Sequence, residues 1–100
     1  MHTTPLTLLT IVAEAILKDR LVEEFTQTGA KGHTLTECEG SGSRHRRVGE
    51  VLGANIKLEL IVSAEVADRM LKVLAEEYFP HYAVIAYISS VSVDRGEKYV

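Results

Sequence analysis

The pattern of apolar and polar residues along the chain predicts four β-strands. The predicted strands are residues 6–12, 33–39, 55–62 and 82–93. The third is the most regular, because its aliphatic side chains share one face while Lys57 and Glu59 lie on the other. The fourth is apolar on both faces over its first half, which is typical of a central strand or of a strand in a subunit interface.

Residues 14–28 repeat their apolar side chains with the period of a helix. Leu17, Leu21 and Phe25 recur at every fourth position, while charged residues occupy the opposite side. Gly29 follows directly, where a left-handed C-cap favours glycine. The pattern therefore predicts an amphipathic helix that ends at Gly29.

A second helix is predicted between the third and fourth strands. Its apolar residues recur at positions 66, 70 and 74, Ser63 is a candidate N-cap, and Pro80 ends the helix near Phe79. The resulting order of strand, helix, strand, strand, helix, strand is that of an α+β ferredoxin-like βαββαβ sandwich. Residues 1–100 then form a single domain in which both helices cover one face of an antiparallel sheet.

The other face of this sheet is left bare by the predicted topology. Strands one and four bring leucine, isoleucine, valine and tyrosine side chains to the sheet, so the bare face is not all polar. Because a large exposed apolar face is uncommon on a monomer, we expect self-association through it.

Composition excludes several classes of protein. The chain has 100 residues and a formal net charge of -3, which disfavours a globally basic nucleic-acid-binding protein. Its one cysteine, Cys38, excludes an internal disulfide framework and a multi-cysteine zinc site. The longest apolar run, residues 82–88, is too short to span a bilayer, so we expect a soluble cytoplasmic protein.

The segment of residues 40–54 has the chemistry of an anion-binding loop. Glycine and serine let backbone N–H groups approach an anion closely, and arginine forks onto phosphate or carboxylate oxygens. The spacing is not that of a Walker A loop. Composition alone leaves open a solvated loop whose charges serve solubility. The candidate ligand-contacting residues are Gly42, Ser43, Arg44, Arg46 and Arg47.

A second candidate lies at the turn before the second strand. Gly32 and Thr34 follow Lys31 there, and they offer backbone groups and a hydroxyl to a base or a phosphate. The alternative is an ordinary connection between a helix and a strand.

The remaining polar residues form no catalytic or metal-binding pattern. None of the four histidines pairs with another histidine or with Cys38 at a metal-ligand spacing. Cys38 has no histidine that would activate it as a nucleophile. Glu37, Glu39 and Glu50 flank the basic loop and are expected to be its ion partners. The sequence therefore predicts no metal site and no enzymatic activity.

Four segments together resemble the PII-like signalling proteins, and among them the SbtB type that regulates bicarbonate transport in cyanobacteria. The segments are Gly-Ala-Lys-Gly-His-Thr at 29–34, Gly-Ser-Arg at 42–44 with Arg47, Asn-Ile-Lys-Leu-Glu at 55–59, and the apolar run at 82–88. The resemblance covers nearly the whole chain, to about residue 93.

This resemblance implies a homotrimer whose sheets pack around a three-fold axis. Adenine nucleotides (cAMP, AMP, ADP or ATP) would bind in the clefts between subunits. Residues 40–54 would form the T-loop, which closes on the ligand and contacts a partner protein. A divalent ion accompanying ATP would be held through the phosphates, with few protein ligands. The implied partner is a sodium-dependent bicarbonate transporter of the inorganic-carbon concentrating response, which would recruit the protein to the cytoplasmic side of the membrane.

The resemblance also implies roles for individual residues. Ser43, Arg44 and Arg47 match loop positions expected to hold phosphate, and Arg46 is an additional candidate. Gly42 would allow a close backbone approach, while Gly32 and Thr34 match the strand start near the base.

Three alternatives remain open from the sequence. The first is a carboxysome-associated PII-like protein that senses bicarbonate and ADP. The second is a small ferredoxin-like enzyme, either a phosphohydrolase or an oxygenase. The third is a structural trimer whose basic loop binds an acidic partner without nucleotide.

Overall fold

A computed structural model describes residues 2–39 and 54–100 of the chain. The predicted order of strands and helices is confirmed. The strands are β1 (Thr3–Glu14), β2 (Thr34–Cys38), β3 (Asn55–Val62) and β4 (Ile85–Asp94). The helices are α1 (Lys18–Thr28) and α2 (Ala64–Val73). Three shorter helical turns accompany them: the 3-10 turn η1 (Ala15–Leu17), the π-helical turn η2 (Leu74–Tyr78) and the 3-10 turn η3 (Gly96–Tyr99).

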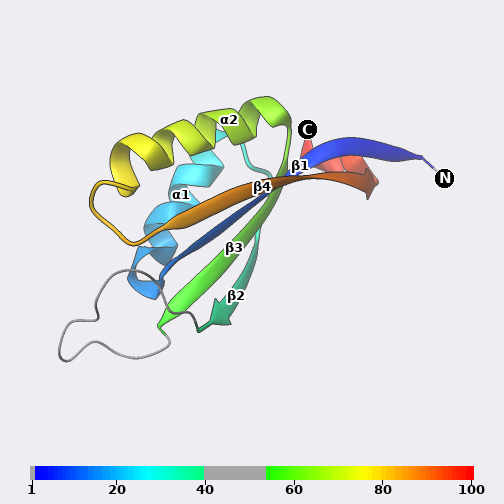
Figure 1. Cartoon of the computed structure of the whole chain (residues 1–100). Coiled ribbons are helices and arrows are strands. Elements are labelled where there is room, and N and C mark those ends of the chain that lie inside the picture. The colour runs from blue at the N-terminus through cyan, green and yellow to red at the C-terminus, as the bar shows by residue number, and fades with distance from the viewer. Residues whose placement is uncertain (1, 40–53) are drawn as a thin grey trace.

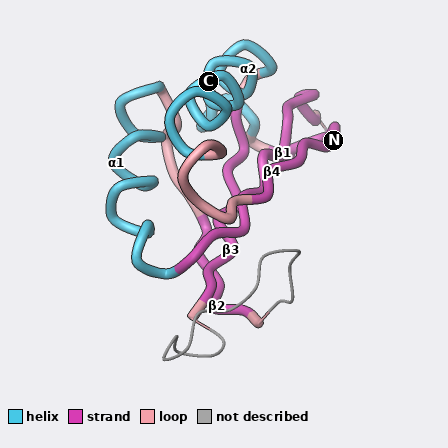
Figure 2. The backbone as a smooth tube through the Cα atoms, turned by 60° about the vertical axis from the view of Figure 1, so that its left-hand side comes forward, coloured by secondary structure: helices cyan, strands magenta, loops and turns pink. Residues whose placement is uncertain are grey.

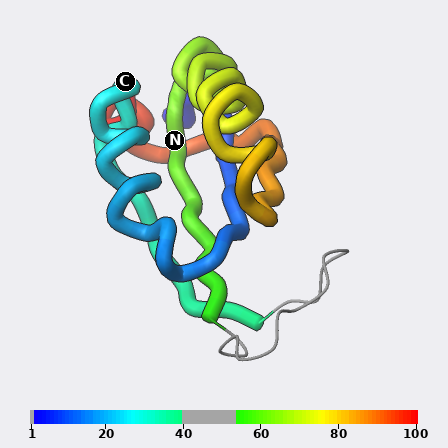
Figure 3. The backbone as a smooth tube through the Cα atoms, turned by 90° about the vertical axis from the view of Figure 1, so that its left-hand side faces the viewer, coloured from blue at the N-terminus to red at the C-terminus, as the bar shows by residue number. Residues whose placement is uncertain are grey.

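The four strands form one antiparallel sheet in the order β2-β3-β1-β4. Both helices lie on the same side of this sheet (Figure 1). In Figure 3, α1 lies to the left and α2 to the upper right, and β3 (green) is seen between them. This arrangement is the ferredoxin-like fold predicted from the order of elements.

The hydrophobic core lies between the sheet and the two helices. Alternate residues of β1 and β3 point into it, so every second side chain of β3 is buried as its pattern predicts. Phe25 of α1 and Tyr78 of η2 are almost completely buried among them. The strand residues of this core are Leu9, Ile11, Ala13, Ile56, Leu58, Leu60 and Val62.

Both predicted helix caps are present. The Ser63 hydroxyl accepts a hydrogen bond from the Val66 N–H at 3.2 Å and begins α2. Gly29 ends α1 with a φ of 122°, a left-handed conformation that glycine adopts without strain, and its N–H donates to the Phe25 carbonyl at 3.1 Å. The second helix ends in a π-helical turn, in which the Phe79 N–H donates to the Leu74 carbonyl at 2.8 Å.

The last strand differs from its prediction in two ways. It begins at Ile85, because the chain turns over residues 79–82, where the Tyr82 N–H donates to the Tyr78 carbonyl at 2.9 Å, and residues 83 and 84 are not paired with β1. It also lies at the edge of the sheet, where Tyr87 and Ile88 are each 50% exposed. The expectation of a central strand is therefore wrong. A place in a subunit interface is the alternative that still accounts for its apolar residues.

The ends of β1 and β4 extend beyond the other strands as a two-stranded arm (Figures 1 and 2). Here β1 pairs with β4 from Thr3 onward but with β3 only from Thr7. The residues after β4 form η3, which packs against the start of β1. Gly96 approaches so closely that an added Cβ would overlap the side chain of Thr4.

Candidate functional site

A shallow hollow of about 370 Å³ lies where α1 connects to β2. Its floor is apolar, since Phe25 and Leu60 are both buried, and its rim includes the exposed residues Lys31 and His33. Gly32 also lines it, so the structure places this predicted site residue beside a concave surface. An apolar floor with polar groups at the rim is the usual character of a small-molecule site. The lining residues are Val22, Phe25, Thr26, Ala30, Lys31, Gly32, His33 and Leu60.

Gly32 differs from the two other glycines that the structure describes. Gly29 has a positive φ, and Gly96 lies against Thr4, so the fold itself requires a small residue at both positions. A Cβ added at Gly32 would meet no atom within 4 Å, and its backbone is not in the left-handed region. The fold of the single chain does not require glycine at position 32. The position is open to close approach by another molecule.

Thr34 lies on the opposite side of the sheet from this hollow. Its neighbour Leu35 is paired with Leu58, whose side chain is in the core, so Thr34 points away from the helices. Across the strands Thr34 is paired with Glu59. Within one chain the structure therefore brings Gly32 and Thr34 to the start of the same edge strand but not into one pocket.

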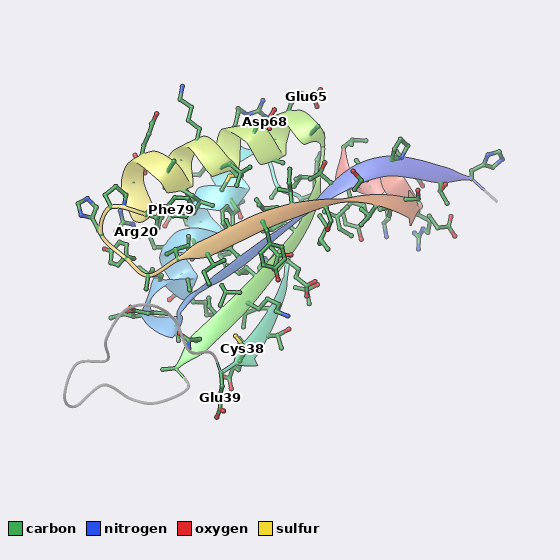
Figure 4. All side chains as sticks on the ribbon, in the orientation of Figure 1. Arg20, Cys38, Glu39, Glu65, Asp68 and Phe79 are labelled. Atoms are coloured by element: carbon green, nitrogen blue, oxygen red, sulfur yellow. The ribbon has the colours of Figure 1, made fainter. Side chains whose placement is uncertain are left out.

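The predicted loop residues Gly42, Ser43, Arg44, Arg46 and Arg47 lie outside the described part of the chain. The structure does place the two strands from which their segment departs. Cys38, the last residue of β2, is paired with Asn55, the first residue of β3, so both ends of the segment lie at the same end of the sheet. Cys38 and Glu39 mark this end in Figure 4.

Over two rows the bare face of the sheet is divided into two halves of different chemistry, whereas the next row combines Ser89 of β4 with Leu8 and Ile61. Directly paired residues share a face, so strand register gives the composition of each row. One row runs Ile85, Val12, Lys57, Thr36, and the next runs Tyr87, Thr10, Glu59, Thr34. We call the β1 and β4 side, with Leu8, Val12, Ile85 and Tyr87, the apolar half, and the β2 and β3 side, with Thr34, Thr36, Lys57 and Glu59, the polar strip.

The chain matches the family model "Nitrogen regulatory protein P-II" over residues 6–98. It belongs to the P-II family. The crystal structure of a PII-like signaling protein from Thermus thermophilus is 60% identical to this P-II protein, covers 100% of both chains and superposes with a TM-score of 0.88. The resemblance to PII-like signalling proteins is thereby confirmed.

Structures of CPII from Thiomonas intermedia share the fold at lower identity. The form bound to ADP, AMP and acetate is 22% identical over 99% of this chain and 98% of that chain, with a TM-score of 0.85. The form bound to ADP and bicarbonate is 23% identical over the same shares of the two chains, with a TM-score of 0.86.

A tyrosine–arginine cluster in this P-II protein connects the end of the second helix to the first. The Arg20 guanidinium lies 4.9 Å from the Tyr78 ring centre and 5.9 Å from that of Tyr82, and it donates to the Tyr82 hydroxyl at 3.2 Å. Tyr78 donates to the Glu24 carboxylate at 3.4 Å. Figure 4 shows Arg20 near the end of the helix that carries Phe79. These contacts hold the turn that precedes β4 against α1.

Sequence analysis did not find this cluster. The four-residue spacing from Leu74 to Tyr78 could have indicated a buried tyrosine, but no pattern identifies Arg20 as its partner. Burial raises the pKa of Tyr78, and the Glu24 carboxylate raises it further, whereas Arg20 opposes the shift. The Tyr78 hydroxyl in turn raises the pKa of Arg20. Both groups keep their ordinary protonation states at neutral pH, so the cluster is a structural contact.

Within residues 2–39 and 54–100, no group of three or more histidine, cysteine, aspartate or glutamate side chains is placed to hold a metal ion. The same residues contain no helix that is long and apolar enough to cross a membrane.

Proposed function

We propose that this P-II protein is a homotrimeric sensor that binds cAMP, AMP, ADP or ATP in clefts between its subunits and signals through its T-loop, residues 40–54. The observation that carries the proposal is the match to the P-II family over residues 6–98. Two features of the fold support it. The apolar half of the bare face is suited to subunit contact, and the hollow beside Gly32 is open to a ligand.

In this proposal the T-loop supplies the phosphate contacts. Ser43, Arg44 and Arg47 hold the phosphates, Arg46 adds positive charge, and Gly42 lets the backbone approach the ligand. Gly32 and Thr34 lie near the base. Gly32 and Thr34 face opposite sides of one edge of the sheet, so a single subunit does not bring both to one ligand. Two neighbouring subunits that meet at the cleft are suited to provide one of these contacts each.

The signal is a shift between two states of the T-loop. A nucleotide changes their populations only as far as it binds one state more tightly than the other. Nucleotides that share adenine contacts but differ in phosphates therefore produce different loop populations. A partner that prefers one loop state is then bound or released.

We propose as partner a sodium-dependent bicarbonate transporter, contacted from the cytoplasmic side of the membrane, as in the SbtB type of PII-like protein. The support is the resemblance of segments 29–34 and 55–59 to that type. Binding of the transporter's cytoplasmic face in one nucleotide state, and its release in another, is the expected behaviour.

A second candidate is a sensor of bicarbonate together with ADP. It is favoured by the CPII structures, which share this fold and include one bound to ADP and bicarbonate. The two candidates differ in one measurable property. In the second, adding bicarbonate changes the affinity for ADP, whereas in the first the nucleotide affinity is independent of bicarbonate.

The role of Gly32 is tested by enlarging its side chain. Replacing Gly32 by valine is expected to raise the Kd for adenine nucleotides at least about tenfold, equivalent to about 1.4 kcal/mol, because the new side chain occupies the space into which the ligand approaches. Gly32→Ala is expected to have a smaller effect in the same direction. The free energy of unfolding should change by less than about 0.5 kcal/mol, as for an open surface position.

Isothermal titration and urea unfolding measure the two quantities. Ala75→Val, an exposed alanine on η2, is the matched control and should leave nucleotide affinity unchanged. Unchanged affinity in Gly32→Val would remove Gly32 from the site.

A further inference from the structure

We infer that Arg20 is a positioning residue for the nucleotide site of this P-II protein. It holds the turn of residues 79–82 against α1, and through α1 it fixes the end of the sheet from which the T-loop departs. The inference rests on the proposed function, in which the T-loop supplies the phosphate contacts. It gives the tyrosine–arginine cluster, which makes none of the proposed ligand contacts, a role in ligand binding.

The last residue of the T-loop is bonded directly to the segment that begins the first helix. The Ala15 N–H donates to the Ala54 carbonyl at 2.8 Å. Ala15 begins η1, which leads without a break into α1 at Lys18, so Arg20 lies in the first turn of α1. A shift of that first turn is therefore transmitted to Ala54 through a short stretch of helical backbone and one hydrogen bond.

The turn that Arg20 contacts lies at the same end of the sheet. The strand that follows it, β4, begins at Ile85, which is paired with Val12 of β1. Further along β1, Glu14 is paired with Asn55, the residue after Ala54. Figure 1 shows the start of α1 and the start of β4 toward the same end of the molecule. The turn, η1 and the end of the T-loop are thus neighbours in the fold.

The guanidinium of Arg20 contacts two tyrosines at once. It lies 4.9 Å from the Tyr78 ring centre and 5.9 Å from that of Tyr82, and it donates to the Tyr82 hydroxyl at 3.2 Å. A planar, delocalised cation stacks on aromatic rings while the N–H groups at its edge donate hydrogen bonds. A lysine ammonium is a compact charge without such a plane. Arg20 therefore ties both the end of η2 and the turn to α1.

Within the described part of the chain, the backbone hydrogen bonds of this turn are local. The His81 and Tyr82 N–H groups donate to the Tyr78 carbonyl at 3.0 and 2.9 Å, and the Val84 N–H donates to the Tyr82 carbonyl at 3.0 Å. Residues 83 and 84 are not paired with β1. Tyr82 and Val84 also pack against the core. Without Arg20 the turn therefore stays folded but is held less firmly against α1.

Removing the guanidinium is expected to weaken nucleotide binding. Arg20→Met should raise the Kd of the tightest-binding of cAMP, AMP, ADP and ATP about three- to tenfold, as for residues that act on a site through others. Tyr82→Phe removes only the hydroxyl that accepts from Arg20 and should act in the same direction. Because both changes remove one shared contact, the Kd of the double variant should lie within about twofold of that of Arg20→Met. Isothermal titration measures all four proteins.

Amide hydrogen exchange measures the transmission to the T-loop directly. In Arg20→Met the Ala15 amide, which donates to Ala54, should exchange at least about fivefold faster. The Gly29 amide donates to the Phe25 carbonyl at the other end of α1 and should keep its wild-type rate. Lys18→Met is the matched control variant, because it removes the same charge from an exposed position on the same helix. It should leave the Kd and both exchange rates unchanged.

Arg20→Lys separates position from charge. Lysine keeps the positive charge but lacks the stacking plane, so the Kd should remain at least about twofold above the wild-type value. Wild-type affinity in both Arg20→Lys and Tyr82→Phe would instead assign Arg20 to electrostatic attraction of the phosphates, and it would contradict the positioning role.

Two failures are distinguishable. A wild-type protein that binds none of the four nucleotides overturns the proposed function and the role of Arg20 with it. A wild-type protein that binds nucleotide, but whose Arg20→Met variant matches Lys18→Met in Kd or in exchange of the Ala15 amide, overturns the role of Arg20 alone.

Discussion

Replacing Arg44 and Arg47 together by alanine is expected to lower the affinity for ATP and ADP by at least about 100-fold, because each hydrogen bond between charged groups contributes about 1.5–3 kcal/mol. The proposed trimer should remain intact, since the proposal assigns both arginines to ligand contacts and not to subunit contacts. Affinity for adenosine, which has no phosphate, should change little. The loss is therefore specific to the phosphate-bearing part of the ligand.

Isothermal titration with adenosine, ADP and ATP measures this difference, and light scattering checks the mass. The matched control replaces Lys18 and Lys72 by alanine, which removes the same amount of positive charge from exposed positions on the two helices. Wild-type affinity for ATP in the arginine variant would remove both arginines from the site. An equal loss in the lysine control would indicate a general effect of net charge.

Replacing Tyr78 by alanine is expected to have the largest effect on stability, about 3–5 kcal/mol, as for other large aromatic side chains removed from a core. Tyr78 is fully buried, its ring contacts Arg20, and its ring centre lies 6.2 Å from that of Tyr82. The substitution leaves a cavity at the end of the second helix. It also removes the contact that holds the turn before β4.

Tyr78→Phe is the matched control, because it keeps the ring and removes only the hydroxyl that donates to Glu24. Its expected cost is below about 1.5 kcal/mol, the contribution of one ordinary hydrogen bond. Urea unfolding at a fixed protein concentration compares the three proteins, since assembly also affects stability. A cost for Tyr78→Ala no larger than that for Tyr78→Phe would contradict the described packing.

The raised pKa of Tyr78 adds a dependence on alkaline pH. The folded state holds the phenol proton more tightly, whereas the unfolded chain releases it near pH 10, the ordinary value for tyrosine. The contribution is therefore fully present below about pH 10 and is lost as pH rises from there through the folded pKa. Tyr78→Phe lacks this contribution, so its stability should fall less over that range.

The sequence predicted best those elements whose structure depends on residues close together in the sequence. The bounds of β3 match because strict alternation of Ile56, Leu58 and Leu60 leaves only one face for the core. Ser63 and Gly29 were recognised as caps because local backbone chemistry determines them. The same local rules placed the two helices and gave the correct order of elements.

The sequence predicted less well where separate segments meet. Residues 82–84 are as apolar as a strand, but Tyr82 is held by Tyr78 and Arg20, and the segment stays outside β4. The sequence predicts Gly32 and Thr34 as one site, but Gly32 lies in the connection before β2 and lines the hollow, whereas Thr34 faces the other side of the sheet. Neither fact can be obtained from periodicity, because both depend on tertiary packing and strand register.

The most direct test of the central claim is isothermal titration of the purified protein with cAMP, AMP, ADP and ATP, with its mass measured in parallel. The account predicts micromolar binding of at least one of these ligands, at one nucleotide per subunit. The order of affinities then identifies the physiological signal. An intact trimer that binds none of the four would contradict the proposed function while leaving the fold unchanged.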